Sequence, residues 1–432
     1  MFLNPRRLYS RTSSFFTFPS FSKAAKEDRG DVAYQTIFAI QPLSAGTFAI
    51  LPLANKVLER LTKIIDHEFQ AIDGQKIVLP SLSHSQLWRK SGRWDRYGPV
   101  LFRVTDRAGQ EFCLGPTHEE TVTQCIAALE ISSVGTKLPI RLYQTSWKFR
   151  DEDRPKRGLL RAREFLMADM YSFDSDLEKC QETYDTVTGA YDRIFNRIGL
   201  PFVRVLASSG DMGGSVSHEY HYCSPHGEDV VYACGTCEHK INGEALKDAN
   251  DTRCPSCSSE MQKLQGIEVG HTFILGDTYS KLFGAKSFQN GQNLPLQMGC
   301  YGIGVTRIMS AAAHILSQGL KLKLPDAIAP FTVGVIGPKQ GSREYEDLNP
   351  RAMEMADQLD RILPSHRVIF DDRKWSIGRK LLELKSSGIP HQVVLGKNGL
   401  ELHSPDTEFT NVDGPEVIHN FFKELVVKRE LL

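Results

Sequence analysis

The residues best able to do chemistry lie in two arginine-containing segments about 150 residues apart. Segment 147–152 reads Trp-Lys-Phe-Arg-Asp-Glu and contains Arg150, and segment 299–307 reads Gly-Cys-Tyr-Gly-Ile-Gly-Val-Thr-Arg and ends in Arg307. An arginine keeps its charge and presents a planar fork of donors that fits phosphate and carboxylate oxygens. Two such arginines from distant parts of a chain can hold a nucleotide triphosphate from both sides.

The element that must position the first arginine is a hairpin. Alternating polar and apolar side chains predict one strand over 143–150 and a second over 163–173, with a charged turn rich in breakers between them. We expect Arg150 on the more polar face of this antiparallel pair. Taken singly, Arg150 is better explained as a surface salt bridge to Asp151 or Asp153, but the whole set of residues favours a ligand-binding role.

Apolar periodicity predicts the surrounding elements. Beyond a linker at 325–330, strands and helices alternate, which is typical of a small α/β domain with a partly parallel sheet. The predicted helices are 53–69, 177–198, 308–316, 353–363 and 377–385, and the further predicted strands are 76–80, 331–336, 367–370 and 391–395.

A cysteine-rich insert at about 223–265 gives an independent signal. Cys234 and Cys237 form one Cys-x2-Cys pair, Cys254 and Cys257 form another, and 16 residues separate the pairs. This spacing predicts a structural zinc ribbon, whose closed tetrahedral site leaves no position for catalysis. The alternative is a degenerate insert whose thiols stay reduced and empty.

The two arginine segments resemble motifs 2 and 3 of the class II aminoacyl-tRNA synthetases, and segments Gly115–Glu120 and Gly270–Gly276 resemble the prolyl-tRNA synthetase family. The likeness runs from about residue 45 to 396. It implies a class II α+β catalytic domain over 30–325, with an antiparallel sheet, helices and the cysteine insert, followed by a C-terminal α/β anticodon-binding domain over 330–432. The helix at 53–69 and the strand after it would be motif 1, which implies a homodimer.

The resemblance implies ATP-dependent activation of proline and its transfer to tRNA(Pro), with Mg2+ as a cofactor. Arg150 would bridge the α-phosphate of ATP and the carboxylate of proline, and Arg307 would pack on adenine and reach the γ-phosphate. These two arginines are the implied catalytic residues. The implied ATP-binding set is Arg150, Glu152, Arg161, Phe165, Gly302, Gly304 and Arg307.

The resemblance also implies a proline site formed by Thr117, Glu119, His271 and Phe273. The imino group of proline is cationic, so a carboxylate and a hydroxyl are suitable partners for it. His271 and Phe273 would flank the pyrrolidine ring. Thr117 with Glu120 can equally be a capping box at a helix start, and both roles can hold together.

The family's bacterial-type members carry a hydrolytic editing domain between motifs 2 and 3. Only about 48 residues separate Tyr220 from Glu268 here, which is too few for that domain. We therefore expect no editing of mischarged alanine by this chain. A pocket for proline rejects smaller amino acids by only about 1–3 kcal/mol, so some alanine should be activated.

The first 29 residues are rich in Arg and Ser and contain no acidic residue before Glu27, which predicts a mitochondrial transit peptide and a location in the matrix. A disordered basic tail is the alternative. Net charge is zero, so a tRNA site must be a local basic face, and no apolar run is long enough to predict a membrane span.

Two rival functions fit the same body. One is another class II enzyme, such as a threonyl or histidyl synthetase, against which segments Gly115–Glu120 and Gly270–Gly276 argue. The other is a synthetase-like accessory protein that binds nucleic acid without catalysis, which the retention of Arg150 and Arg307 disfavours.

Overall fold

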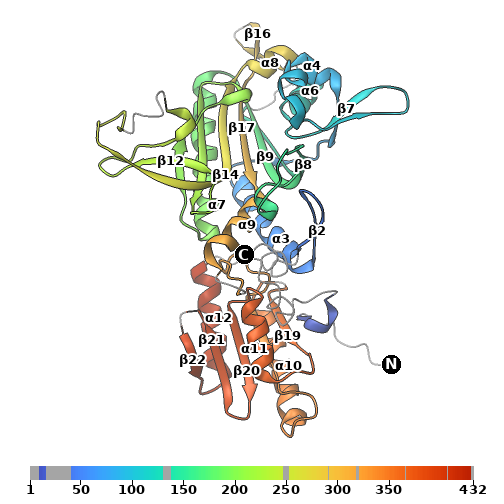
Figure 1. Cartoon of the computed structure of the whole chain (residues 1–432), viewed down its shortest axis with the longest axis vertical. Coiled ribbons are helices and arrows are strands. Elements are labelled where there is room, and N and C mark those ends of the chain that lie inside the picture. Colours follow the sequence, from blue (N-terminus) through green and yellow to red (C-terminus); the bar gives the residue numbers. More distant parts are fainter. Residues whose placement is uncertain are drawn as a thin grey trace.

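The chain is described by a computed structural model that covers residues 9–15, 40–129, 138–246, 253–289, 291–317, 321–364, 366–405 and 407–429. An upper body is built on a nine-stranded sheet and a lower body on a six-stranded sheet (Figure 1). Among the described residues, every helix is too short or too polar to span a lipid bilayer.

The nine-stranded sheet is mainly antiparallel, and the predicted arginine hairpin lies within it as β8 and β9, with Lys148 opposite Phe165. Its centre, β8–β9–β17–β14, is antiparallel throughout. In order across the sheet, the strands are β11 (Val216–Cys223), β10 (Val203–Leu206), β13 (Lys240–Asn242), β12 (Asp229–Cys234), β14 (Met261–Gly276), β17 (Gln297–Gly304), β9 (Glu164–Asp174), β8 (Ile140–Phe149) and β4 (Gln75–Lys76).

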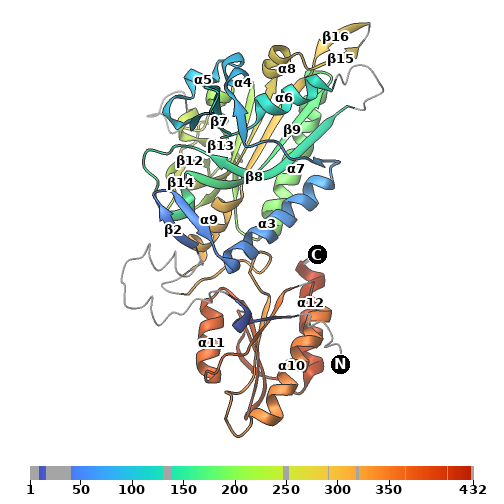
Figure 2. The ribbon, with the colours of Figure 1, turned by 90° about the vertical axis from the view of Figure 1, so that its right-hand side faces the viewer.

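Helices α3 (Pro52–Gln70), α7 (Leu177–Ile198) and α9 (Val305–Leu316) pack together with the sheet to form the main core (Figure 2). The apolar stripe predicted on α3 is buried, and burying each such side chain contributes about 1.5–3 kcal/mol. Helix α7 has the predicted bounds because both ends are set locally. The Asp176 side chain accepts a hydrogen bond from the Lys179 N–H at 2.9 Å, and Gly199 ends the helix at φ 86°.

The strand predicted over 76–80 is wrong beyond its first residue. Strand β4 ends at Lys76, and only the Ile77 N–H adds a further bond, to the Tyr143 carbonyl at 2.8 Å. The Leu79 N–H bonds to the side chain of Gln144 at 3.1 Å, and Val78 is 92% exposed. The apolar run therefore continues as an irregular segment in which a side chain takes over the bond at Leu79.

A small unit at the top of the body carries segment Gly115–Glu120, one of the two segments that contribute to the predicted proline site. It comprises a three-stranded sheet and four short helices, with a protruding hairpin beside them (Figure 1). The elements are β5 (Leu82–His84), α4 (Ser85–Lys90), α5 (Arg93–Arg96), β6 (Arg103–Thr105), β7 (Glu111–Leu114), α6 (Glu119–Ala128), α8 (Thr278–Phe283), β15 (Lys286–Gln289) and β16 (Gln292–Pro295), and a further hairpin, β2 (Ile40–Ser44) and β3 (Thr47–Ile50), lies near α3.

The cysteine-rich insert joins the central sheet. Its strands β12 and β13 pair with each other, and β12 pairs with the first half of β14. Because β14 runs unbroken from Met261 to Gly276, the predicted boundary near residue 265 falls inside one strand. Residues 247–252 of the insert lie outside the described part of the chain.

The lower body has the alternating strands and helices predicted for it. Strands β19, β18 and β20 are parallel, and β21 and β22 continue antiparallel. Helix α10 begins at Tyr345, earlier than predicted, with Pro350 inside it. Helices α10 and α12 cover one face and α11 the other (Figure 2), and the elements are β18 (Val333–Ile336), α10 (Tyr345–Ile362), β19 (Val368–Asp371), α11 (Ile377–Ser386), β20 (His391–Gly396), β21 (Gly399–Ser404), β22 (Thr407–Asn411) and α12 (Pro415–Arg429).

Part of the predicted leader is folded onto this lower body. Strand β1 (Ser10–Arg11) pairs in parallel with β19 at the edge of the sheet, and Tyr9 is buried in the core beneath it. The Thr12 hydroxyl donates to Asp372 at 2.8 Å, and the Phe15 ring meets Phe331 at 5.6 Å. Residues 1–8 and 16–29 of the predicted leader lie outside the described residues.

Candidate active site

One cavity of about 490 Å3 opens where β8, β9, β14 and β17 lie side by side. All the residues assigned to ATP or proline from the sequence line it. They are Thr117, Glu119, Arg150, Glu152, Arg161, Phe165, His271, Phe273, Gly302, Gly304 and Arg307. Another cavity, of about 1080 Å3, lies between the two bodies and contains none of these residues, so size alone does not identify the site.

Arg150 follows directly after β8 and projects into the cavity. Its guanidinium lies over the Phe165 ring at 5.2 Å, and its backbone N–H donates to the Arg163 carbonyl at 2.9 Å. The alternative of a salt bridge is wrong for the described residues, since Asp151 pairs with Arg163 and Asp153 with a different arginine. The buried Arg150 Nε has no hydrogen-bond partner among the described residues, so the fork is left for an anion.

Glu152 and Arg161 close one end of the cavity. The Arg161 Nε donates to Glu152 at 2.8 Å, and its Nη1 donates to Glu228 at 3.3 Å. The hydrogen bond with Glu152 is the largest cause that raises the pKa of Arg161. The carboxylate predicted to recognise adenine is therefore held in place by an arginine that was itself predicted to bind ATP.

Arg307 lies in the first turn of α9, and its side chain is aimed by two other segments. Its Nε donates to the Leu160 carbonyl at 3.1 Å, and its Nη1 donates to the Glu268 carbonyl at 3.0 Å and lies 3.3 Å from the Glu268 carboxylate. Arg150 and Arg307 thus approach the cavity from different elements, the end of β8 and the first turn of α9.

Three acidic or imidazole groups gather beside these arginines. Atoms of Glu219, Glu268 and His271 lie within 4.8 Å of one another. Burial acts to raise the pKa of Glu268, but the hydrogen bond from His271 and the charge of Arg307 outweigh it and hold that pKa well below its usual range. Glu268 is therefore ionised at neutral pH. Neither glutamate was assigned a role from the sequence, because they lie 49 residues apart in segments without a metal spacing.

The glycines of the second arginine segment make room for cavity side chains. A Cβ at Gly302 would lie 2.3 Å from the Met167 side chain, and one at Gly304 would lie 3.3 Å from the Cβ of Arg307. Met167 and Arg307 both line the cavity. A side chain at Gly302 would push the flexible end of Met167 aside, and one at Gly304 would press closely on Arg307.

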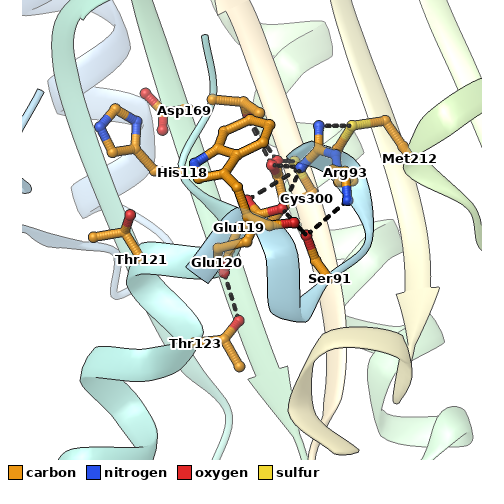
Figure 3. Close-up of polar contacts among 12 residues, drawn as sticks. Ser91, Arg93, His118, Glu119, Glu120, Thr121, Thr123, Asp169, Met212 and Cys300 are labelled. Carbon is orange, nitrogen blue, oxygen red and sulfur yellow. Dashed lines mark hydrogen bonds and ion pairs between the residues drawn. The ribbon is translucent and has the colours of Figure 1, made fainter. Parts of the chain in front are cut away.

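The opposite end of the cavity is built around a buried carboxylate, Glu119, the first residue of α6 (Figure 3). The Thr117 hydroxyl donates to this carboxylate at 2.6 and 2.8 Å, and the Cys300 thiol donates to it at 3.2 Å. Arg93 Nη1 donates to its other side at 3.0 Å. Arg93 and Cys300 were missed by sequence reasoning, since nothing in their local patterns points to Glu119.

The capping-box interpretation of this segment is wrong. The N-cap of α6 is His118, and the side chain of this residue makes no capping hydrogen bond. Thr117 instead donates to Glu119. Thr117 and Glu119 therefore bond to each other at the cavity wall, and Thr117 does not cap the helix.

His271 and Phe273 form one wall of the cavity. Because they alternate along β14 their rings lie on the same face, and they stack on each other at 4.0 Å. His271 Nε2 lies 2.6 Å from the Ser217 hydroxyl, which fixes the orientation of the imidazole. The two rings are adjacent, so they leave no gap between them in which a pyrrolidine ring could be flanked as predicted.

The four cysteines of the insert meet as predicted. Their Sγ atoms lie within 4.8 Å of one another, with Cys234 to Cys257 and Cys237 to Cys254 both at 3.5 Å. Four thiolates around zinc at about 2.3 Å stand about 3.8 Å apart, so this set fits a tetrahedral Zn–S4 site. All four cysteines are free of disulfides.

Comparisons with known proteins identify the family of the chain. Residues 102–315 match the family model described as tRNA synthetase class II core domain (G, H, P, S and T). The human protein named "Probable proline--tRNA ligase, mitochondrial" is 44% identical over 367 residues, covering 84% of this chain and 76% of the human protein. The protein of that name from Schizosaccharomyces pombe is 40% identical over 361 residues, covering 83% of each chain.

The fold is also found among solved structures. The prolyl-tRNA synthetase of Cryptosporidium parvum, solved with L-proline and AMP, superposes with a TM-score of 0.71 at 16% identity, covering 96% of this chain and 79% of that one. The family match and the fold together show the core of a class II aminoacyl-tRNA synthetase. Within that class, the chain belongs to the proline–tRNA ligase family.

Proposed function

We propose that the chain is a proline–tRNA ligase of mitochondrial translation. The carboxylate of proline attacks the α-phosphorus of ATP, and pyrophosphate leaves to give prolyl-adenylate. A hydroxyl of the terminal ribose of tRNA(Pro) then attacks the prolyl carbonyl, and AMP leaves. Little covalent work falls to the protein, so positioning and neutralisation of charge must supply most of the acceleration.

The observation that carries the proposal is the polarity of one cavity. An anionic end formed by Thr117 and Glu119 suits the cationic imino group of proline. A cationic part, formed by Arg150 and Arg307, suits the phosphates of ATP. Phe165, with Arg150 over it, provides an aromatic face for adenine. The two substrates would meet between these ends, at Arg150.

Charging of tRNA tests this function directly. The protein should attach labelled proline to a tRNA(Pro) transcript in the presence of ATP and Mg2+, and should not attach threonine or histidine to their tRNAs. Charging with threonine or histidine would favour the rival synthetases. Binding of tRNA with no charging of any amino acid, by folded protein, would favour the accessory-protein function.

We place Mg2+ at Glu219 and Glu268. Their carboxylate oxygens lie close enough to share one ion, and Mg2+ prefers such ligands, whereas His271 is better suited to orienting them. The bound ion would neutralise phosphate charge. Glu268→Gln should raise the Mg2+ concentration needed for half-maximal activity, measured by titrating Mg2+ at saturating proline and ATP.

The four-cysteine cluster is proposed as a structural zinc site. Cys234 is the last residue of β12 and is paired with Met261, the first residue of β14. Zinc at the cluster would therefore stabilise the pairing of these two strands at this end. The cluster lies outside the cavity residues, so zinc would support the fold of the insert without taking part in the reaction.

The lower body is proposed to read the anticodon of tRNA. Its surface carries Trp375 between two guanidiniums, with Arg373 at 4.1 Å and Arg379 at 3.9 Å from the ring. A cationic aromatic group is suited to unstacked bases and phosphates, which are the readable parts of an RNA loop. Arg379→Ala should raise the KM for tRNA(Pro) and leave ATP–pyrophosphate exchange unchanged.

Alanine is proposed to escape correction by this chain. The described residues between Tyr220 and Glu268 form only the end of β11, the strands β12 and β13, one 3-10 turn at Gly243–Ala245 and the start of β14. Alanine-dependent exchange should therefore accompany proline-dependent exchange, and Ala-tRNA(Pro) should persist. Rapid hydrolysis of Ala-tRNA(Pro) by the purified protein would contradict this proposal.

A homodimer is proposed through the region that resembles motif 1. Val78 and Leu82, in the segment that follows β4, are exposed, at 92% and 48%, and this apolar segment would be covered by a second copy. Light scattering after size exclusion should give twice the chain mass of 48.5 kDa, and Val78→Glu should shift it toward one chain mass.

The matrix is the proposed location, since the Arg- and Ser-rich start has the composition of an import leader. The contacts of Tyr9, Thr12 and Phe15 with the lower body argue for a revised boundary. We propose that any cleavage of the leader leaves the segment from Tyr9 attached. Sequencing the N-terminus of the protein from mitochondria tests this, and a mature start after Phe15 would contradict it.

A further inference from the structure

We infer that Arg93 is a positioning residue for the proline site. It lies against a buried pair of glutamates, Glu119 and Glu120, and keeps Glu119, the one that lines the cavity, negatively charged. The inference rests on the proposed function and deepens it, since it concerns how the imino group is recognised. Arg93 itself is behind the cavity wall and touches no predicted ligand position.

The side chain of Arg93 is enclosed on all sides by protein. It is 1% exposed, and its guanidinium lies over the rings of Trp88 at 4.9 Å, Tyr97 at 5.3 Å and Tyr279 at 6.0 Å. Its Nη2 donates to the Met212 sulfur at 3.4 Å. These contacts come from four separate segments, so the guanidinium has one well-defined position.

From that position one nitrogen serves both glutamates (Figure 3). Nη1 lies 3.0 Å from Glu119 and 3.1 and 3.2 Å from the two oxygens of Glu120, and both carboxylates are completely buried. The Ser91 hydroxyl also donates to Glu120, at 2.7 Å. The cluster therefore links α5 to the start of α6.

The two glutamates differ in what they face. Glu119, Tyr97 and Met212 line the cavity, whereas Arg93 and Glu120 are not among the described residues that do. One cation lies between two carboxylates, and of the two only Glu119 lines the cavity. To bind a cationic imino group there, the carboxylate of Glu119 must be ionised.

The pKa shifts of the two glutamates are in opposite directions and support an ionised Glu119. Burial acts to raise the pKa of Glu119, but Arg93 and the Thr117 hydroxyl outweigh it, so the pKa falls below its ordinary value. For Glu120, burial prevails over Arg93, and its pKa is raised. Without the guanidinium, a fully buried Glu119 would lose its main counter-charge and tend to bind a proton in place of the substrate.

The test separates proline from ATP in the exchange reaction. A charge-assisted hydrogen bond lost from the proline site corresponds to an increase of about 10- to 100-fold in the KM for proline in Arg93→Gln. The KM for ATP should stay within about twofold, since Arg93 is remote from Arg150 and Arg307. Arg93→Lys keeps the charge but loses the fork, and should give an intermediate KM for proline.

The matched control is Arg103→Gln. Arg103 is in the same small unit, lies over Trp94 at 4.9 Å and donates to the Trp94 carbonyl at 2.7 Å, but does not reach Glu119. Its KM for proline should stay within about twofold of the parent. If Arg93→Gln does not fold, Arg93→Lys decides the question.

Equal increases in the KM for proline and for ATP, or a KM for proline unchanged in the folded Arg93 variants, would overturn the inference. Activity of the parent protein with proline is the separate check on the proposed function. A parent that exchanges only with another amino acid would refute that function, whatever the Arg93 variants do.

Discussion

Replacement of Arg150 by alanine should separate catalysis from stability. Among the described residues, the guanidinium has one side-chain contact, the Phe165 ring at 5.2 Å, and a partly exposed pair of this kind contributes about 1 kcal/mol. The backbone hydrogen bond to Arg163 remains in alanine. Unfolding free energy should therefore fall by about 1 kcal/mol or less, which is a Tm change of only about 2–4 °C.

Catalysis should fall much further. If Arg150 neutralises charge that develops at the α-phosphate, its loss removes a preorganised group worth about 10²–10³ in kcat. ATP–pyrophosphate exchange with proline, measured alongside a thermal melt, gives both quantities for the same preparation. Arg150→Lys should recover only part of the loss, because a lysine cannot donate two parallel bonds.

Arg154→Ala is the matched control, since Arg154 is in the same turn, is 90% exposed and pairs only with its neighbour Asp153 among the described residues. It should keep exchange activity and stability. Exchange by Arg150→Ala within about threefold of the parent would refute the assignment of Arg150, and a large loss of stability would refute the claim that the arginine is free for ligand.

Three further outcomes follow from the structure. Burial raises the pKa of Asp174 to about 6, above its value in the unfolded chain. The stabilising effect of the protonated carboxyl is therefore present below about pH 4 and is lost as the pH rises through 6, a loss of up to about 3 kcal/mol in the free energy of unfolding. Asp174→Asn should remove this pH-dependent loss, measured by urea unfolding. Cys237→Ser should lower bound zinc from one ion per chain, measured by native mass spectrometry, and should speed amide exchange in β12. Deleting residues 1–15 should lower the stability of the lower body by at least about 2 kcal/mol and speed amide exchange in β19, because Tyr9 leaves its core.

Each of these has a control in the same chain. Asp176→Asn changes an exposed helix cap and should lack the pH effect centred near 6. Cys125→Ser changes an exposed cysteine remote from the cluster and should leave the zinc content unchanged. Deleting residues 1–8 removes none of the described contacts of β1, so equal loss of stability in both deletions would contradict the docking of Tyr9.

Elements with local signals were predictable from the sequence. The cap Asp176 and the left-handed Gly199 bound α7, and alternation marked the β8–β9 hairpin. The strand expected at 76–80 failed because apolar residues occur in irregular segments too, here with Val78 exposed. The docking of β1 could not be read from a leader-like composition, since parallel pairing with β19 involves residues more than 350 positions away.

The site divides in the same way. Thr117, Arg150 and Arg307 lie in segments with strong family resemblance, so the amino-acid sequence alone predicts them as site residues, and all three line the cavity. Arg93 could not be assigned, because its role depends on the place where α5 meets α6. The acidic pair Glu219 and Glu268 forms only when β11 pairs with β14. Site residues that come together only when distant segments pack cannot be predicted from the spacing of residues along the sequence.

Whether the chain activates proline is decided by ATP–pyrophosphate exchange on the protein from Tyr9 onward, with each amino acid supplied singly. We expect strong exchange with proline, weak exchange with alanine, and none with threonine or histidine. Absence of exchange with every amino acid, from protein that is folded and binds ATP, would contradict proline activation by this site.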